Sequence, residues 1–154
     1  MEFGTIEREI HVEATPEVVF EVITKPEHLR EWWPDDATLE AVPGGAGELI
    51  WGEGGTQHPM VVPITVVDAV PGKLFSFRWV APEGEVPGPA NSLLVTFELV
   101  PQGAGTVVRL TESGFRERGW EAAVLEAAYN EHVTGWDLFV PRLGVYIARL
   151  VSTP

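Results

Sequence analysis

The sequence of 154 residues predicts an α+β fold, in which a curved antiparallel sheet of six to seven strands wraps around a long C-terminal helix. Three observations predict this fold class. Segments between residues 6 and 112 alternate apolar and polar residues with the period of two typical of strands. Two short helical segments follow the first of them, and residues 120–150 carry a bulky apolar stripe at helical spacing. The predicted order is β-α-α-β-β-β-β-β-β-α, in a single domain over residues 1–154.

The first strand is predicted over residues 6–13, where apolar and charged residues alternate. Thr15 is the expected N-cap of a helix over 17–24, with Pro16 at its first position. This helix ends at Lys25, because the residue before a proline disfavours the helical region. A second short helix is predicted over 27–33 and stops before the next proline.

Six further segments, separated by turns rich in glycine and proline, are predicted to form the rest of the sheet. They cover residues 38–42, 47–53, 60–70, 74–80, 91–100 and 106–112. Pro63 interrupts the longest of them and indicates an edge or a bulge at that point. Residues 81–90 hold several prolines and glycines and are predicted to form a loop.

The C-terminal stretch over 120–150 is predicted to be one bent helix. Thr134 resembles the start of a new helix, whereas Pro141 removes one backbone hydrogen bond and favours a bend in a continuous helix. One long helix cannot fill the concave side of a strongly curved sheet. The sequence therefore predicts a cavity between the sheet, this helix and the two short helices.

Side chains from several elements are expected to meet in this cavity. Trp33, Trp79 and Trp136 are the leading candidates because they lie on three different elements, although packing in the core is the alternative for each tryptophan. The full set of predicted ligand-binding residues is Trp33, Trp51, Phe77, Trp79, Phe97, Glu112, His132, Trp136 and Val140.

Two polar residues in this set have chemistry of their own. Glu112 shares strand parity with Val108 and Leu110 and is expected to point inward, or else to reach water at the margin of the sheet. His132 lies on the apolar stripe of the last helix, either as a hydrogen-bonded core residue or as a ligand contact. These two are the weak candidates for proton transfer, and no catalytic constellation is evident.

Composition excludes several classes of function. A net charge of −13 repels nucleic acids and anionic membranes, and no basic cluster offsets it. The absence of cysteine excludes disulfides and thiolate sites, and four histidines scattered over separate elements predict no metal site and no cofactor. No apolar stretch approaches the roughly 20 residues of a membrane span, and the first residues do not resemble a signal peptide. A cytoplasmic location is expected.

Several motifs recur together in one known family. They are Pro16-Glu17-Val18-Val19-Phe20, Leu29-Arg30-Glu31-Trp32-Trp33, the runs over 67–79 and 105–115, and Gly135-Trp136. Over essentially its whole length the chain resembles the branch related to the C-terminal domain of the heat-shock-chaperone ATPase activator. That branch belongs to the SRPBCC, or START-like, superfamily, and the resemblance implies the helix-grip fold of the birch-pollen allergen. Members include carriers of hydrophobic ligands, polyketide cyclases and co-chaperone domains, and the resemblance implies no shared catalytic triad.

The leading hypothesis is a non-enzymatic module that binds a small hydrophobic or aromatic molecule. The first alternative is an enzyme of the polyketide cyclase or aromatase type, in which Glu112 or His132 moves protons. The second is a co-chaperone-type interaction domain with a protein partner, whose outer surface matters more than its cavity. The sequence leaves open whether the chain is a monomer or a homodimer.

Overall fold

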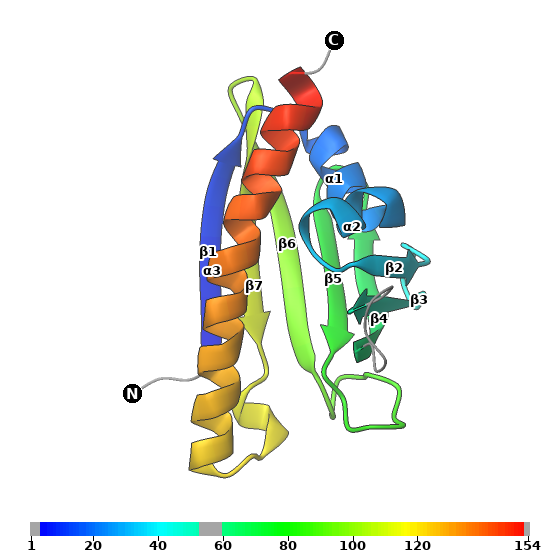
Figure 1. The fold of residues 1–154 in the computed structure, drawn as a ribbon, viewed down its shortest axis with the longest axis vertical. Helices are drawn as coiled ribbons and strands as arrows, with labels where there is room; N and C mark the ends of the chain where they lie inside the picture. The colour runs from blue at the N-terminus through cyan, green and yellow to red at the C-terminus, as the bar shows by residue number, and fades with distance from the viewer. Residues whose placement is uncertain (1–3, 53–59, 153–154) are drawn as a thin grey trace.

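The computed structural model describes residues 4–52 and 60–152. Within these ranges, seven strands form one antiparallel sheet in the order β1-β7-β6-β5-β4-β3-β2 (Figure 1). The elements are β1 (Thr5–Val12), α1 (Pro16–Thr24), α2 (Pro26–Trp32), β2 (Asp36–Leu39), β3 (Ala46–Trp51), β4 (Met60–Val70), β5 (Leu74–Trp79), β6 (Leu93–Gln102), β7 (Gly105–Ser113), the short 3-10 helix η1 (Arg116–Arg118) and α3 (Ala122–Ser152). The predicted fold class and element order are confirmed.

The two short helices carry the chain from one edge of the sheet to the other. Strand β1 pairs with β7 at one edge, and β2 pairs with β3 at the opposite edge. Helix α1 begins as predicted, because the Thr15 side chain accepts a hydrogen bond from the Val18 backbone N–H at 3.3 Å. Helix α2 ends one residue earlier than predicted, so Trp33 is its C-cap residue rather than its last helical residue.

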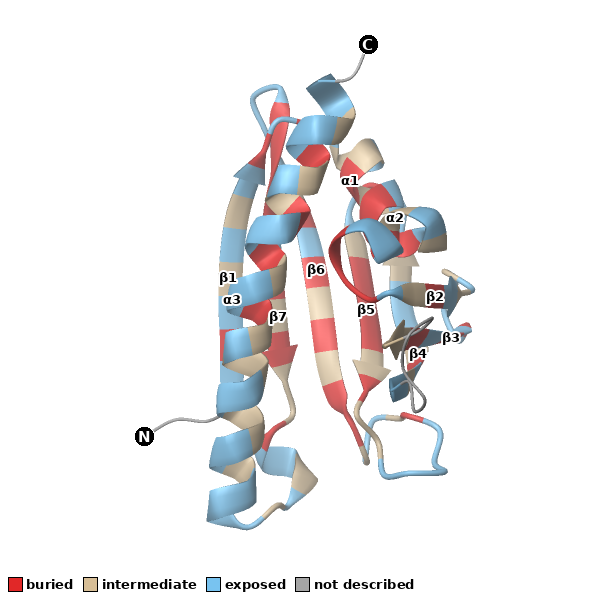
Figure 2. Cartoon of the chain, viewed as in Figure 1, coloured by how far each residue is buried: buried red, intermediate tan, exposed pale blue. Residues whose placement is uncertain are grey.

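The core lies between the sheet and the three helices. Alternate residues of β6 are buried, most residues of β5 and β7 are buried, and the buried positions of α3 fall on the side facing the sheet (Figure 2). The buried positions of α3 are Trp136, Val140, Leu143 and Ile147. Removing a large apolar side chain from water contributes about 1.5–3 kcal/mol, so this stripe is what holds the helix on the sheet.

Strand β4 shows how a proline fits inside a sheet. Strand β4 is an edge of the sheet only over part of its length. Strand β5 ends at Trp79, opposite Ile64, so at Pro63 strand β4 has only β3 as a neighbour. The missing N–H of the proline ring therefore costs no hydrogen bond to β5. The register shift in β4 lies further along, between Val66 and Asp68.

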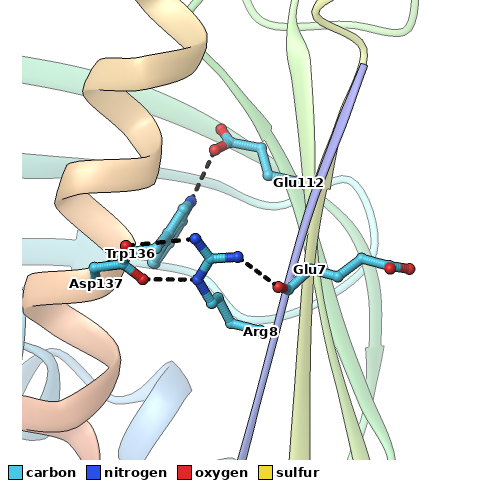
Figure 3. Close-up of polar contacts among 5 residues, drawn as sticks. All are labelled: Glu7, Arg8, Glu112, Trp136 and Asp137. Carbon is cyan, nitrogen blue, oxygen red and sulfur yellow. Dashed lines mark hydrogen bonds and ion pairs between the residues drawn. The ribbon is translucent and has the colours of Figure 1, made fainter. Parts of the chain in front are cut away.

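Helix α3 is a single helix that continues through Pro141. The predicted continuity is therefore correct, and no new helix begins at Thr134; Figure 1 shows the axis curving gently along its length. Polar contacts reinforce its position: Arg8 on β1 forms a 2.7 Å ion pair with Asp137 (Figure 3). The hydroxyl of Tyr146 lies 2.6 Å from Nδ1 of His28 on α2. None of the helices described is long and apolar enough to cross a membrane.

Candidate functional site

A cavity of about 620 Å³ opens between the sheet and the middle of α3. Its walls come from the end of α2, the adjoining ends of β3, β4 and β5, the loop that follows β5, and one face of α3. The residues that line it are Trp33, Trp51, Met60, Val61, Val62, Pro63, Trp79, Val80, Ala81, Pro82, Glu83, Gly84, Glu85, Pro87, Glu131, His132, Gly135, Trp136 and Phe139.

Trp33 is the centre of an aromatic cluster at this cavity. Its ring centroid lies 5.3 Å from that of Trp136 on α3 and 5.4 Å from that of Trp79 on β5. Trp51 on β3 approaches the same ring edge-on at 6.0 Å. Tilted and edge-to-face pairs at these distances contribute about 0.5–1.5 kcal/mol each beyond their buried area. The cluster therefore gives the cavity a preformed aromatic wall.

Glu112 lies fully buried behind this wall and accepts hydrogen bonds from two indoles. Trp79 Nε1 donates to Oε2 at 2.6 Å, and Trp136 Nε1 donates to Oε1 at 2.8 Å. Nδ1 of His132 lies 2.8 Å from Oε1 and 2.9 Å from Oε2. Figure 3 shows the Trp136 indole reaching from α3 toward the carboxylate on β7. Because an indole N–H only donates, the glutamate acts as the acceptor for both rings.

The carboxylate favours one tautomer of a neutral His132 ring. An acceptor already engaged by two donors favours a proton on Nδ1, so that this nitrogen also donates to Glu112. In that neutral tautomer Nε2, at the far side of the ring, carries a lone pair, and it has no hydrogen-bond partner among the described residues. His132 lines the cavity, with 15% of its side chain exposed. A hydrogen-bond acceptor is thus available at the cavity wall.

The charged residues that line the cavity are all acidic. They are Glu83 and Glu85 in the loop after β5 and Glu131 on α3, and no lysine or arginine is among the described residues that line the cavity. Arg142 is the cation placed beside an aromatic wall residue, with its guanidinium carbon 5.5 Å from the Phe139 ring centroid. The mouth of the cavity is therefore negative, which disfavours an anionic ligand.

The loop that forms one wall leaves the sheet through a strained residue. Val80 has φ of +62°, the one non-glycine residue with positive φ in the described part of the chain. A β-branched residue in the left-handed region costs about 1–2 kcal/mol, so packing around Val80 must offset this cost. Strain of this kind is common where a loop is held against a ligand site.

The sequence-predicted residues divide into two layers. Trp33, Trp51, Trp79, His132 and Trp136 line the cavity. The other four stand behind it and support the wall: Phe77, Phe97, Glu112 and Val140 are buried but do not line it.

Sequence reasoning missed Phe139, loop residues 80–85 and Pro87 as cavity residues, and also residues 60–63, Glu131 and Gly135. Phe139 lies three residues after Trp136 on the apolar stripe, which was a usable signal. The loop has no periodicity that would show which way it folds. Within residues 4–52 and 60–152, no group of three or more histidines and carboxylates is placed to hold a metal ion.

Comparison with known proteins gives a family and a set of fold neighbours. The family model for Activator of Hsp90 ATPase homolog 1-like protein matches residues 13–148. No curated protein matches the sequence. The protein MLL2253 from Mesorhizobium loti has a solved structure with 24% identity and a TM-score of 0.73, and the match covers 94% of this chain and 97% of that one.

Two other solved structures have the same fold. The Aha1 dimer from Colwellia psychrerythraea is 22% identical with a TM-score of 0.70, over 94% of this chain and 96% of that one. DynU16, a protein in the dynemicin biosynthetic locus, is 21% identical with a TM-score of 0.69, over 97% of this chain and 48% of that one. At these identities the likeness establishes the fold alone. With the family model matching most of its length, the chain belongs to the family of Activator of Hsp90 ATPase homolog 1-like proteins.

Proposed function

We propose that this chain binds a small neutral or cationic molecule with an aromatic or apolar body in the cavity between the sheet and α3. The observation that carries the proposal is the preformed wall of Trp33, Trp51, Trp79, Trp136 and Phe139, contributed by separate elements around one space. A volume of about 620 Å³ is in the usual range for small-molecule sites, about 300–1,000 Å³.

The polar groups at the cavity narrow the class of ligand. Nε2 of His132 is available as an acceptor, so a ligand with a phenol, enol or amine N–H would complete its hydrogen bonding. The three glutamates that line the cavity disfavour carboxylates and phosphates and tolerate a protonated amine, which the aromatic faces also attract. The preferred ligand is therefore an aromatic hydrogen-bond donor without negative charge.

Tryptophan fluorescence tests this proposal directly. The intrinsic emission should be quenched by saturable binding of neutral phenols or flavonoids and of aromatic amines, and size-matched aromatic carboxylates should bind more weakly. Trp51→Ala should weaken binding because it removes part of the wall. Trp120→Ala is the matched control, because Trp120 does not line the cavity. A flat response to every compound, or equal losses in both variants, would contradict the proposal.

A polyketide cyclase or aromatase-like enzyme is the second candidate, and the Glu112–His132 pair at the cavity favours it. Nε2 of His132 would remove a proton from an acidic carbon of a bound polyketide chain, and Glu112 would stabilise the resulting imidazolium. In this reading His132→Ala binds a poly-β-ketone analogue but does not cyclise it. Equal cyclisation by wild type and variant would exclude this role.

An interaction domain of the co-chaperone type is the third candidate, suggested by the family. Leu138 and Val145 are exposed large apolar residues on the outer side of α3, where a protein partner or a second copy would find apolar surface. Sedimentation analysis of the purified chain distinguishes a monomer from a homodimer, and Leu138→Glu should disrupt a dimer that uses this surface.

A further inference from the structure

A second cavity, of about 590 Å³, lies on the other face of the sheet and has the opposite character. It is formed by the start of β1, the outer face of β5, the chain before β6 and the segment that follows β7. Arg78 marks the face, because side chains alternate along β5 and its neighbours Phe77 and Trp79 point into the core. The two cavities share no lining residue.

Arginine is concentrated at this second cavity. The chain holds 10 lysines and arginines against 23 acidic residues, yet three arginines line this one space: Arg78, Arg116 and Arg118. Glu117 is the one acidic residue among its described lining residues. Within an acidic protein this is a local positive region, and its walls are otherwise small or polar residues such as Ser92, Ser113 and Gly114.

Two of these arginines have no carboxylate partner among the described residues, unlike two arginines elsewhere in the molecule. Arg8 and Arg109 pair with Asp137 and Glu9 at 2.7 and 2.8 Å. Arg78, by contrast, makes one long contact of 3.5 Å from Nη1 to the Ser92 carbonyl and forms no ion pair with a described residue.

Arg118 is the second arginine of this cavity without a carboxylate partner among the described residues. Its Nε is buried without a hydrogen-bond partner among the described residues, and its guanidinium carbon lies 4.6 Å from the Trp120 ring centroid. A buried donor left without a partner costs about 1–3 kcal/mol, so the folded chain gains from a ligand that accepts a hydrogen bond here. Stacking on the indole fixes the guanidinium plane, which lowers the entropy lost when it binds.

The backbone brings the two sides of the cavity close together. Gly114 has φ of +100°, and a Cβ at this position would lie 3.2 Å from the Ser92 carbonyl oxygen. The glycine therefore allows the turn after β7 to pass beside the chain that leads into β6. This approach carries η1, with Arg116 and Arg118, toward Arg78 on β5.

We propose that this second cavity binds the oxyanion group of a small molecule, a phosphate or a carboxylate. Guanidinium groups match the geometry of both anions with paired, charge-assisted hydrogen bonds. The volume exceeds that of a free anion and leaves room for the body of a metabolite. A polyanion such as nucleic acid is excluded by the net charge of −13 over the rest of the molecule.

The test is an isothermal titration of the full chain with four probes at constant ionic strength: inorganic phosphate, pyrophosphate, succinate and citrate. At least one probe should bind saturably with 1:1 stoichiometry, and chloride at the same ionic strength should not. The phosphate and carboxylate probes distinguish the two sources of the anion. Arg78→Gln and Arg118→Gln should each weaken binding about 10- to 100-fold, as expected for the loss of one charge-assisted contact.

Arg109→Gln is the matched control, because it removes the same charge from the outer face of the same sheet without touching the cavity. It should keep affinity within about twofold of the wild type, because charges beyond a Debye length are screened. Amide resonances of Ser113, Gly114 and Arg116 should shift on binding, and those of Gly135 and Phe139 in the aromatic cavity should not. Absence of saturable binding by all four probes, or an equal loss in Arg109→Gln, would overturn the proposal.

Discussion

Replacing Glu112 by glutamine tests whether the buried carboxylate holds the aromatic wall together. The two indoles donate to different oxygens, Trp79 to Oε2 and Trp136 to Oε1. A glutamine offers one carbonyl oxygen and one NH2, so in either orientation of the amide one indole N–H faces another donor. Unlike a surface substitution, this change cannot be relieved by water, because residue 112 is fully buried.

The expected cost follows from one buried, unsatisfied indole N–H, about 1–3 kcal/mol. A loss of about 2 kcal/mol, the middle of this range, is expected. For a domain of this size the loss corresponds to a Tm lowered by about 4–8 °C. Urea denaturation and thermal melts measure the change, and Glu98→Gln is the control, because its exposed side chain on β6 should change stability by less than about 0.5 kcal/mol.

A local measurement separates this mechanism from general destabilisation. The indole N–H resonances of Trp79 and Trp136 should be shifted and protected from exchange in the wild type, and at least one of them should lose both properties in Glu112→Gln. If both resonances are unchanged and stability stays within about 0.5 kcal/mol of the wild type, the carboxylate does not organise the wall, and the reasoning is wrong.

Three smaller predictions concern the attachment of α3 and the strained loop. The hydrogen bond from Arg8 lowers the pKa of Asp137 in the folded state. The pair therefore stabilises the fold fully at pH values above the pKa of the aspartate in the unfolded chain. This stabilisation is lost as the pH falls through the lower pKa of the folded state. Asp137→Asn should therefore flatten the stability profile below about pH 4, by less than about 1 kcal/mol because the pair is exposed, as acid denaturation curves would show. Tyr146→Phe removes the contact with His28 and should cost about 0.5–1.5 kcal/mol in urea denaturation, and an unchanged midpoint would show that the contact does not form. Val80→Gly should stay within about 1 kcal/mol of the wild type in thermal melts, because relief of the positive φ offsets lost packing, and a larger loss would show that the backbone there is not strained.

The spacing of apolar residues predicted the helices and strands because each of them buries only one of its faces. Each strand of the sheet faces the helices with alternate residues, so β5 and β6 could be identified from their apolar alternation alone. The predicted ends of helices and strands were less accurate where a capping residue or a neighbouring strand sets the end of the element. Strand β2 covers Asp36–Leu39 rather than the predicted 38–42, because it extends only as far as its register with β3.

The convergence of Trp33, Trp79 and Trp136 could be predicted because the resemblance supplied the topology, and topology alone brings these three elements together. The hydrogen bonds of Glu112 could not be predicted. Strand parity indicates that the side chain points inward, but whether an indole from α3 reaches it depends on how the helix is rotated about its axis.

The same limit applies to the second cavity. It could not be predicted, since nothing near Arg78 in the sequence shows that Arg118, forty positions later, lies across the same space. The neighbours of Arg78 come from the chain before β6 and the segment after β7, which are adjacent only because Leu94 pairs with Ser113 in the sheet.

The hydrogen bonds to Glu112 also determine how the aromatic wall can recognise a ligand. Trp79 and Trp136 use their N–H groups on the carboxylate, so they present ring surface to the cavity rather than donors. A ligand there gains affinity from contact area and from the quadrupole of the rings, with His132 as the polar contact on the same wall. Under the proposed function, we expect such a site to select by shape and charge more than by the placement of polar groups, and to accommodate related aromatic molecules with similar affinity. Narrow specificity would require the loop after β5, with Glu83 and Glu85, to close against the bound molecule.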